Sequence, residues 1–332
     1  MDISCAFATS LDTPSHIERA EALGYRRAWC YDSPALYPDV WMILGLAAVR
    51  TTVIGLGPAV LVPSLRHPMT NAAAIAGLVA LAPGRVAVAI GSGFTGRMVL
   101  GQRPLRWEDV ADYVGLLRAL LAGEAASWEG RTISMLHPEG FGAPRPIEVP
   151  ILIGADGPKG IAVAAELGDG LFSASVARIE VPASLGWRAL LSFGTVLDPG
   201  EPSTSARAVR AAGPALAVAY HAIYERGGPD AVDRLPGGRA WREATEAVPA
   251  DVRHLALHEG HLIEANRRDE IALREGASLL KTFTLTGTPE ELRRRLESLE
   301  AAGVTEIAYQ PGGPDISREL SAFAGMARLN PR

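Results

Sequence analysis

The sequence predicts an α/β fold, a (β/α)8 TIM barrel that occupies residues 1–332 as a single domain. Eight short apolar runs alternate with amphipathic or alanine-rich helical patterns along the whole chain. The runs are apolar on both faces, as parallel strands covered by helices are. A chain of 332 residues has room for eight such units and for insertions between them.

The eight strands are expected, in chain order, at 2–8, 26–32, 53–61, 85–91, 149–154, 169–174, 188–197 and 304–310. Two segments are longer than a connection between a strand and a helix requires. One is a Pro/Gly-rich stretch at about 124–148, before the fifth strand, and the other is a mostly helical stretch at 200–287, between the seventh and eighth. Neither has the composition of a linker between domains, so both are interpreted as insertions into the barrel.

Composition excludes several classes of partner. The net charge is −5 and the sequence has no basic block, which argues against nucleic acid or an anionic membrane surface. No apolar run reaches the roughly 20 residues of a membrane span, and the first residues lack the basic region of a secretory signal, so a cytoplasmic protein is expected. Cys5 and Cys30, the two cysteines of the chain, are expected as buried thiols in a reducing compartment.

The segment GSGFTG, residues 91–96, matches the G-x-G-x-x-G pattern of dinucleotide-binding folds. That fold also needs a helix directly after the loop and a second strand about 20 residues further on. Here the chain runs through RMVLGQRPLRWEDVADYV into a long helical pattern without a strand. The segment is therefore interpreted as the loop after the fourth barrel strand.

The loops at the carboxyl ends of the expected strands are rich in glycine, small residues and hydroxyl groups, and poor in charge. Such a rim admits a flat, largely uncharged ring system close to the backbone. The loop GADGPKG, residues 154–160, precedes a helix, where backbone amides stabilise a phosphate, and Lys159 adds a positive charge. A turn in which Pro158 takes the first helical position and Asp156 caps the helix is the alternative.

Four segments in the right order resemble the bacterial luciferase-like superfamily: GLGPAVLVPSLRHP, NAAAIAGLVALAPGRVAVAIGSG, IGADGPKGIAVAAELGDG and TGTPEELRRRLESLEAAGVTEIAYQPGGPD. More narrowly they resemble the branch that includes methylenetetrahydromethanopterin reductase and other enzymes of the deazaflavin coenzyme F420. The resemblance implies a barrel that binds a reduced flavin or deazaflavin at its carboxyl rim. It also implies a small-molecule substrate and a homodimer.

The resemblance assigns roles to particular residues. It implies a non-proline cis peptide bond at Ala59–Val60 that lies against the cofactor ring. The residues implied to hold the cofactor's side chain and phosphate are Gly91, Ser92, Gly93, Thr95, Gly154, Ala155, Asp156, Gly157, Pro158 and Lys159.

Asp32 matches an acid that the family uses near the ring, and Ser33 stands where the branch acting on glucose 6-phosphate has a catalytic histidine. This departure argues against that substrate. The alternative role for Asp32 is to cap the helix after the second strand.

The segment RHLALHEGHLIE places His254, His258 and His261 on one face if it is helical. Its H-E-G-H letters lack the H-E-x-x-H spacing of catalytic zinc sites, so no metal site is predicted. Gly260 could end the helix, and a solvated or capping role for these histidines stays open. Because the long insertion could fold over the barrel mouth, His258 or His261 is a candidate proton donor.

The leading hypothesis is an F420-dependent oxidoreductase that transfers hydride between the deazaflavin and a small organic substrate. The first alternative is an FMN-dependent monooxygenase that uses reduced flavin and oxygen in a closed, dry pocket. The second is a flavin-binding protein without catalytic activity. Cofactor identity separates the first two, and turnover of any substrate excludes the third.

Overall fold

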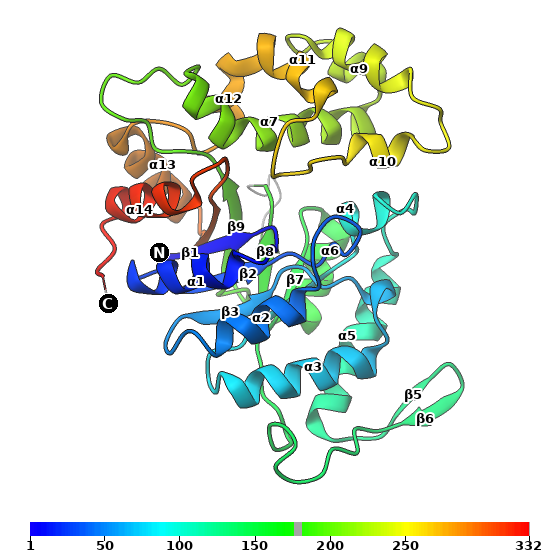
Figure 1. Cartoon of the computed structure of the whole chain (residues 1–332). Coiled ribbons are helices and arrows are strands. Elements are labelled where there is room, and N and C mark those ends of the chain that lie inside the picture. Colours follow the sequence, from blue (N-terminus) through cyan, green and yellow to red (C-terminus); the bar gives the residue numbers. More distant parts are fainter. Residues whose placement is uncertain (176–180, 332) are drawn as a thin grey trace.

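An eight-stranded parallel barrel forms the centre of the computed structural model, which describes residues 1–175 and 181–331 (Figure 1). Its strands are β1 (Asp2–Phe7), β2 (Arg27–Cys30), β3 (Gly55–Pro58), β4 (Val88–Gly91), β7 (Ile151–Gly154), β8 (Gly170–Ser173), β9 (Arg188–Phe193) and β10 (Glu306–Gln310). They pair in the order β3-β2-β1-β10-β9-β8-β7-β4. The bridges Leu56–Val86 and Leu61–Ile90 close the barrel. The predicted fold class and all eight predicted strands are confirmed.

Helices cover the outside of the barrel. They are α1 (Thr13–Ala22), α2 (Val40–Ala48), α3 (Pro68–Leu81), the short α4 (Phe94–Met98), α5 (Trp107–Ala122), α6 (Pro158–Leu167), α13 (Pro289–Ala301) and α14 (Ile316–Ala327). Local signals set their ends: Thr288 and Glu291 form a capping box at the start of α13, and Gly123, with φ +88°, ends α5. No helix within the described ranges combines the length and the apolar content of a membrane-spanning segment.

Side chains alternate between two layers along the strands. On β1, Cys5 and Phe7 pack against the outer helices, and Ala6 points into the barrel. Much of the interior is alanine, which leaves room for the indole rings of Trp29 and Trp187. Both indole N–H groups donate to the buried carboxylate of Glu306, at 2.8 and 2.6 Å, so this interior charge is hydrogen-bonded. Cys5 and Cys30 are buried free thiols, as expected.

The first insertion contains a hairpin that the sequence did not predict. Strands β5 (Ala126–Trp128) and β6 (Arg131–Ile133) pair antiparallel and extend away from the barrel at the lower right of Figure 1. Glu129 and Gly130 form the turn with φ of +50° and +73°, the left-handed conformations that a two-residue hairpin turn requires. Three-residue strands are too short to give a periodic signal.

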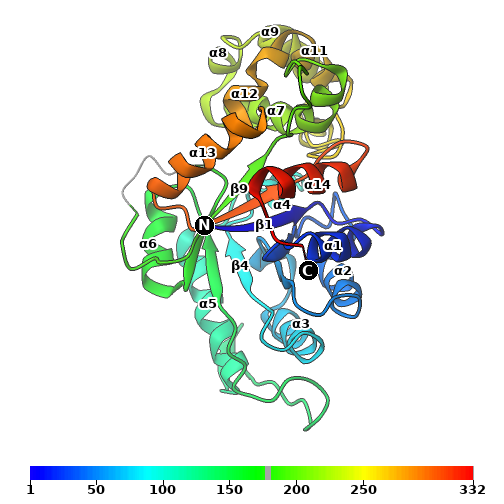
Figure 2. The ribbon, with the colours of Figure 1, turned by 90° about the vertical axis from the view of Figure 1, so that its left-hand side faces the viewer.

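The second insertion is helical and lies between the seventh and eighth barrel strands, as predicted. It comprises α7 (Ala206–Gly227), α8 (Pro229–Val232), α9 (Gly238–Glu246), α10 (Arg253–Leu257), α11 (Arg267–Gly276) and α12 (Leu280–Phe283). Buried residues such as Leu216, Tyr220 and Trp241 form a hydrophobic cluster of its own. Figures 1 and 2 show this insertion at one end of the barrel.

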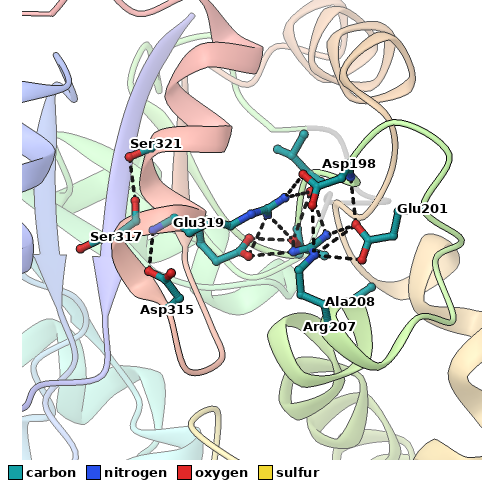
Figure 3. Close-up of polar contacts among 12 residues, drawn as sticks. Asp198, Glu201, Arg207, Ala208, Asp315, Ser317, Glu319 and Ser321 are labelled. Carbon is teal, nitrogen blue, oxygen red and sulfur yellow. Dashed lines mark hydrogen bonds and ion pairs between the residues drawn. The ribbon is translucent and has the colours of Figure 1, made fainter.

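An ion-pair network joins the start of the second insertion to α14 (Figure 3). Arg207 of α7 pairs with Glu201 and, at 3.0 Å, with the buried carboxylate of Glu319 on α14. Arg318 also pairs with Glu319, at 2.9 Å, and reaches Asp198 at 2.6 Å. Glu319 thus lies between two guanidinium groups, which offset the cost of burying its carboxylate. The same contacts hold the start of α7 against α14.

Candidate active site

A cavity of about 480 Å³ opens at the carboxyl ends of the barrel strands. Its walls come from the loops after β2, β3, β4, β7 and β8 and from the second insertion. The residues that line it are Tyr31, Asp32, Ser33, Tyr37, Ala59, Val60, Val62, Gly91, Ser92, Gly93, Phe94, Thr95, Gly96, Trp107, Gly154, Ala155, Asp156, Gly157, Phe172, Ala174, Leu191, Arg226, His261 and Leu262. Barrel enzymes carry their chemistry at this end.

The segment after β3 forms part of the cavity lining around a cis peptide bond. The bond between Ala59 and Val60 is cis, at the position that the resemblance implied. The Val60 side chain lies between Gly91 and Gly154, at the ends of β4 and β7. A Cβ atom at Gly91 would lie 3.0 Å from Val60 Cγ2, and one at Gly154 would lie 2.5 Å from Val60 Cγ1. Both positions therefore need glycine for this packing.

The loop after β4 turns sharply into α4. Gly93 has φ +83° and precedes Phe94, the first residue of α4. No strand follows within 20 residues, which confirms the rejection of a dinucleotide-binding fold. Ser92 and Thr95 line the cavity, as the prediction for this loop requires. The guanidinium of Arg226, from the insertion, lies 4.6 Å from the ring centroid of Phe94, so a cation reaches this wall.

The loop after β7 only partly matches its prediction. Gly154, Ala155, Asp156 and Gly157 line the cavity, whereas Pro158 and Lys159 are exposed and do not. Pro158 takes the first position of α6, as the alternative interpretation expected. Asp156 does not cap that helix.

The Asp156 side chain is directed to another loop instead. Its Oδ1 accepts hydrogen bonds from the backbone amides of Ala174 and Ser175, at 2.9 and 3.0 Å. The first turn of α6 therefore has no side-chain cap. Its free amides remain available to an anion.

Asp32 is a buried acid on the cavity wall, 3% exposed. Arg66 binds its Oδ2 and reaches Asp39 at 2.6 Å, while Oδ1 is buried without a hydrogen-bond partner. Burial raises the pKa of Asp32, and the contact with Arg66 only partly opposes this shift. The helix-capping alternative is wrong, because Asp39 caps α2.

The second insertion closes one side of the cavity through a turn at His261 and Leu262. The Tyr37 hydroxyl donates to the backbone carbonyl of His261 at 2.5 Å, and the Gln310 amide donates to that of Leu262 at 3.2 Å. These two hydrogen bonds tie the insertion to the barrel. Leu262 has φ +62°, a sparsely populated conformation for a leucine.

The histidine segment is not one continuous helix, as the alternative of a break at Gly260 anticipated. Helix α10 ends at Leu257, and Gly260 follows with φ +73°, so His254, His258 and His261 do not share a helical face. His261 reaches the cavity and His258 does not; His258 contacts His261 at 3.4 Å between their Nδ1 atoms. Burial lowers the pKa of His258 to about 4 and that of His261 well below its usual value, so both rings are neutral near pH 7.

Several lining residues escaped sequence reasoning. Tyr31 directly precedes the predicted site residue Asp32, and this position next to it could have indicated that Tyr31 lines the cavity. Arg226 and Leu262 lie in the second insertion, far along the chain from the rim loops. Nothing in the local sequence marks the α7 residue Arg226 or the turn residue Leu262 as facing a distant cavity, so these two positions carry no sequence signal.

Comparisons with known proteins show which family the chain belongs to. The sequence profile of the family described as "Luciferase-like monooxygenase" matches residues 12–306. A 5,10-methylenetetrahydromethanopterin reductase of Archaeoglobus fulgidus is 28% identical, over 92% of this chain and 91% of the relative. An F420-dependent glucose-6-phosphate dehydrogenase of Beutenbergia cavernae is 35% identical, over 43% of each chain.

A solved structure supports the same fold. The coenzyme F420-dependent tetrahydromethanopterin reductase of Methanopyrus kandleri superposes with a TM-score of 0.69, covering 99% of this chain and 100% of that chain at 18% identity. The predicted resemblance is confirmed by the profile, which covers most of the sequence. The chain therefore belongs to the luciferase-like monooxygenase family.

Proposed function

We propose that this luciferase-like oxidoreductase binds coenzyme F420 in the rim cavity and transfers hydride between it and a small organic substrate. The observation that carries the proposal is the cavity itself. Its volume of about 480 Å³ falls within the roughly 300–1,000 Å³ of small-molecule sites. Relatives and structural neighbours named as F420-dependent enzymes favour this cofactor. When bound, F420 supplies the hydride chemistry.

The lining residues fit a flat ring with an anionic side chain. Ala59, Val60 and Gly91 present backbone and small side chains, against which a ring can lie closely. A Cβ atom added at Gly157 would meet no atom of the described residues within 4 Å, and the amides of the first α6 turn suit a phosphate. Arg226 adds a cation to the cavity wall, and the exposed Lys159 lies in the first turn of α6.

Asp32 is the residue that we assign to proton exchange with the substrate. It lines the cavity, its buried Oδ1 has no hydrogen-bond partner among the described residues, and burial raises its pKa. His261 lines the insertion side of the cavity. His258 acts as a positioning residue, because it contacts His261 rather than the cavity.

An FMN-dependent monooxygenase is the second candidate function, favoured by the description of the family profile. It would use the same cavity with a different ring. Titration of the purified protein with F420 and FMN separates the two candidates directly.

The variant Gly157→Ala tests whether the cofactor lies on the α6 loop. Because the added methyl group has no protein neighbour, folding should be unaffected while the space beside the loop amides is filled. We expect F420 to bind about 10-fold more weakly or worse, the effect of one misplaced methyl group in a binding site. Gly77→Ala on α3 is the matched control, since its added Cβ also meets nothing within 4 Å. Equal affinity in both variants would contradict the assignment of this loop.

A further inference from the structure

Three buried histidines meet inside the second insertion. His221 lies on α7, and His258 and His261 lie in the turn after α10. They are 2%, 1% and 6% exposed. One ring nitrogen from each lies within 4.8 Å of the corresponding nitrogen of the other two. Two segments that are distant in sequence thus bring three imidazole ligands to one point.

The spacing within this cluster matches a tetrahedral metal site. Two nitrogens bound to one zinc ion at about 2.0–2.1 Å are themselves about 3.3–3.4 Å apart. The Nδ1 atoms of His258 and His261 are 3.4 Å apart. This separation is long for a hydrogen bond between ring nitrogens, and it suits a shared ion.

In two of the three histidines, the ring nitrogen not used for the ion lies near a carboxyl group. His221 Nε2 lies 2.8 Å from Asp269 Oδ1, and its Nδ1 is buried without a partner. His258 Nε2 lies 3.7 Å from Glu225 Oε1 and has no hydrogen bond. In metal sites a ligating histidine usually donates its second ring N–H to a carboxylate, which fixes the tautomer and the ring orientation.

A cluster held only by hydrogen bonds explains these observations less well. Within the described residues it leaves His221 Nδ1 buried and unsatisfied, and a bound ion would give this nitrogen a partner. Such unsatisfied atoms are rare in folded proteins. Asp269 is 3% exposed and the Glu225 side chain 11% exposed, so two largely buried acidic side chains lie beside the three imidazole rings.

We propose that His221, His258 and His261 bind a zinc ion through three imidazole nitrogens, with the fourth position open to water. Imidazole is a ligand type that Zn²⁺ favours, and three protein ligands with one open position is a common zinc arrangement. The ion joins α7 to the turn whose His261 lines the rim cavity. Loading it therefore stabilises this wall, independently of which redox cofactor the protein uses.

Metal binding is measured on the full chain, purified without a polyhistidine tag and stripped with a chelator. Calorimetry with Zn²⁺ should give one ion per chain, and Co²⁺ should give the intense visible bands of a four-coordinate ion. The thermal midpoint should rise with free Zn²⁺ concentration. None of these readouts depends on F420 or on catalysis, so failure of the proposed function would leave this proposal unaffected. If both ions bound weakly and without fixed stoichiometry, the proposal would be overturned.

Two neighbouring histidines provide a matched pair of variants. His258→Gln should lower Zn²⁺ affinity at least 100-fold, and His254→Gln should leave it unchanged, because His254 is half-buried and outside the cluster. If His258→Gln does not fold, Glu225→Gln keeps the ligands and should still lower the affinity about 10- to 100-fold through His258. Equal Zn²⁺ affinity in His258→Gln and His254→Gln would contradict the proposed site. If His258→Gln does not fold, wild-type Zn²⁺ affinity in Glu225→Gln would contradict it instead.

Discussion

Replacing Tyr37 by phenylalanine is expected to release the insertion's turn from the barrel. The change removes a hydroxyl that donates to the His261 carbonyl at 2.5 Å in a buried setting. A buried carbonyl left unsatisfied costs about 1–3 kcal/mol. At about 2.1 cal/mol/K per residue, the unfolding entropy of 332 residues is about 0.7 kcal/mol/K, so the thermal midpoint should fall by roughly 1.5–4 °C.

Tyr25→Phe is the matched control for this change. Tyr25 is also buried, and its hydroxyl donates to the Leu320 carbonyl at 2.9 Å, away from the residues that line the cavity. Both variants should lose similar thermal stability. Only Tyr37→Phe should speed amide hydrogen exchange in residues 258–266 and weaken cofactor binding. If the two variants show the same exchange and the same affinity, the Tyr37 hydroxyl does not hold the turn.

Three other contacts each lead to a prediction. Gly154→Ala places a Cβ atom 2.5 Å from Val60 Cγ1 and should lower the free energy of unfolding by about 1–3 kcal/mol, measured by denaturant titration. An unchanged free energy of unfolding would show that Val60 can move aside at no cost. Asp32→Asn should lower kcat at least 10-fold. The control is Asp39→Asn, since Asp39 contacts the same Arg66 but does not line the cavity, and this variant should mainly lower the thermal midpoint. Equal kcat values in the two variants would show that Asp32 takes no part in the chemistry. Burial of Glu201 opposes its ionisation, but hydrogen bonds, chiefly from Arg207, outweigh this effect and lower its pKa from 4.5 to about 2. Its stabilising contribution should therefore be complete above pH 4.5 and be lost as the pH falls toward 2, and Glu201→Gln should flatten that part of the midpoint-against-pH curve.

The barrel was predictable because each strand is a run of apolar residues on both faces. The ends of the strands were harder to predict than the strands themselves. For β3, the apolar run 53–61 predicts a longer strand than the observed Gly55–Pro58. Apolar character continues through Ala59 and Val60, but the cis bond turns the chain out of the ladder there and into the cavity lining.

The rim loops were predictable because glycine and small polar residues directly follow the strands. Of the residues predicted in the loop after β7, Pro158 and Lys159 lie at the exposed start of α6 and do not line the cavity. The insertion side was not predictable in detail. His221 lies on a different helix from His258, so no local spacing could reveal their contact, and the prediction of no metal site rested on spacing alone.

The most direct test of the proposed function is a pair of binding titrations of the cofactor-free protein, with F420 and with FMN, followed by tryptophan fluorescence. Trp107 lines the cavity and can report occupancy. Micromolar or tighter binding of F420, without binding of FMN, is the predicted result. A preference for FMN would favour the monooxygenase, and binding of neither would contradict the assignment of the rim cavity as a cofactor site.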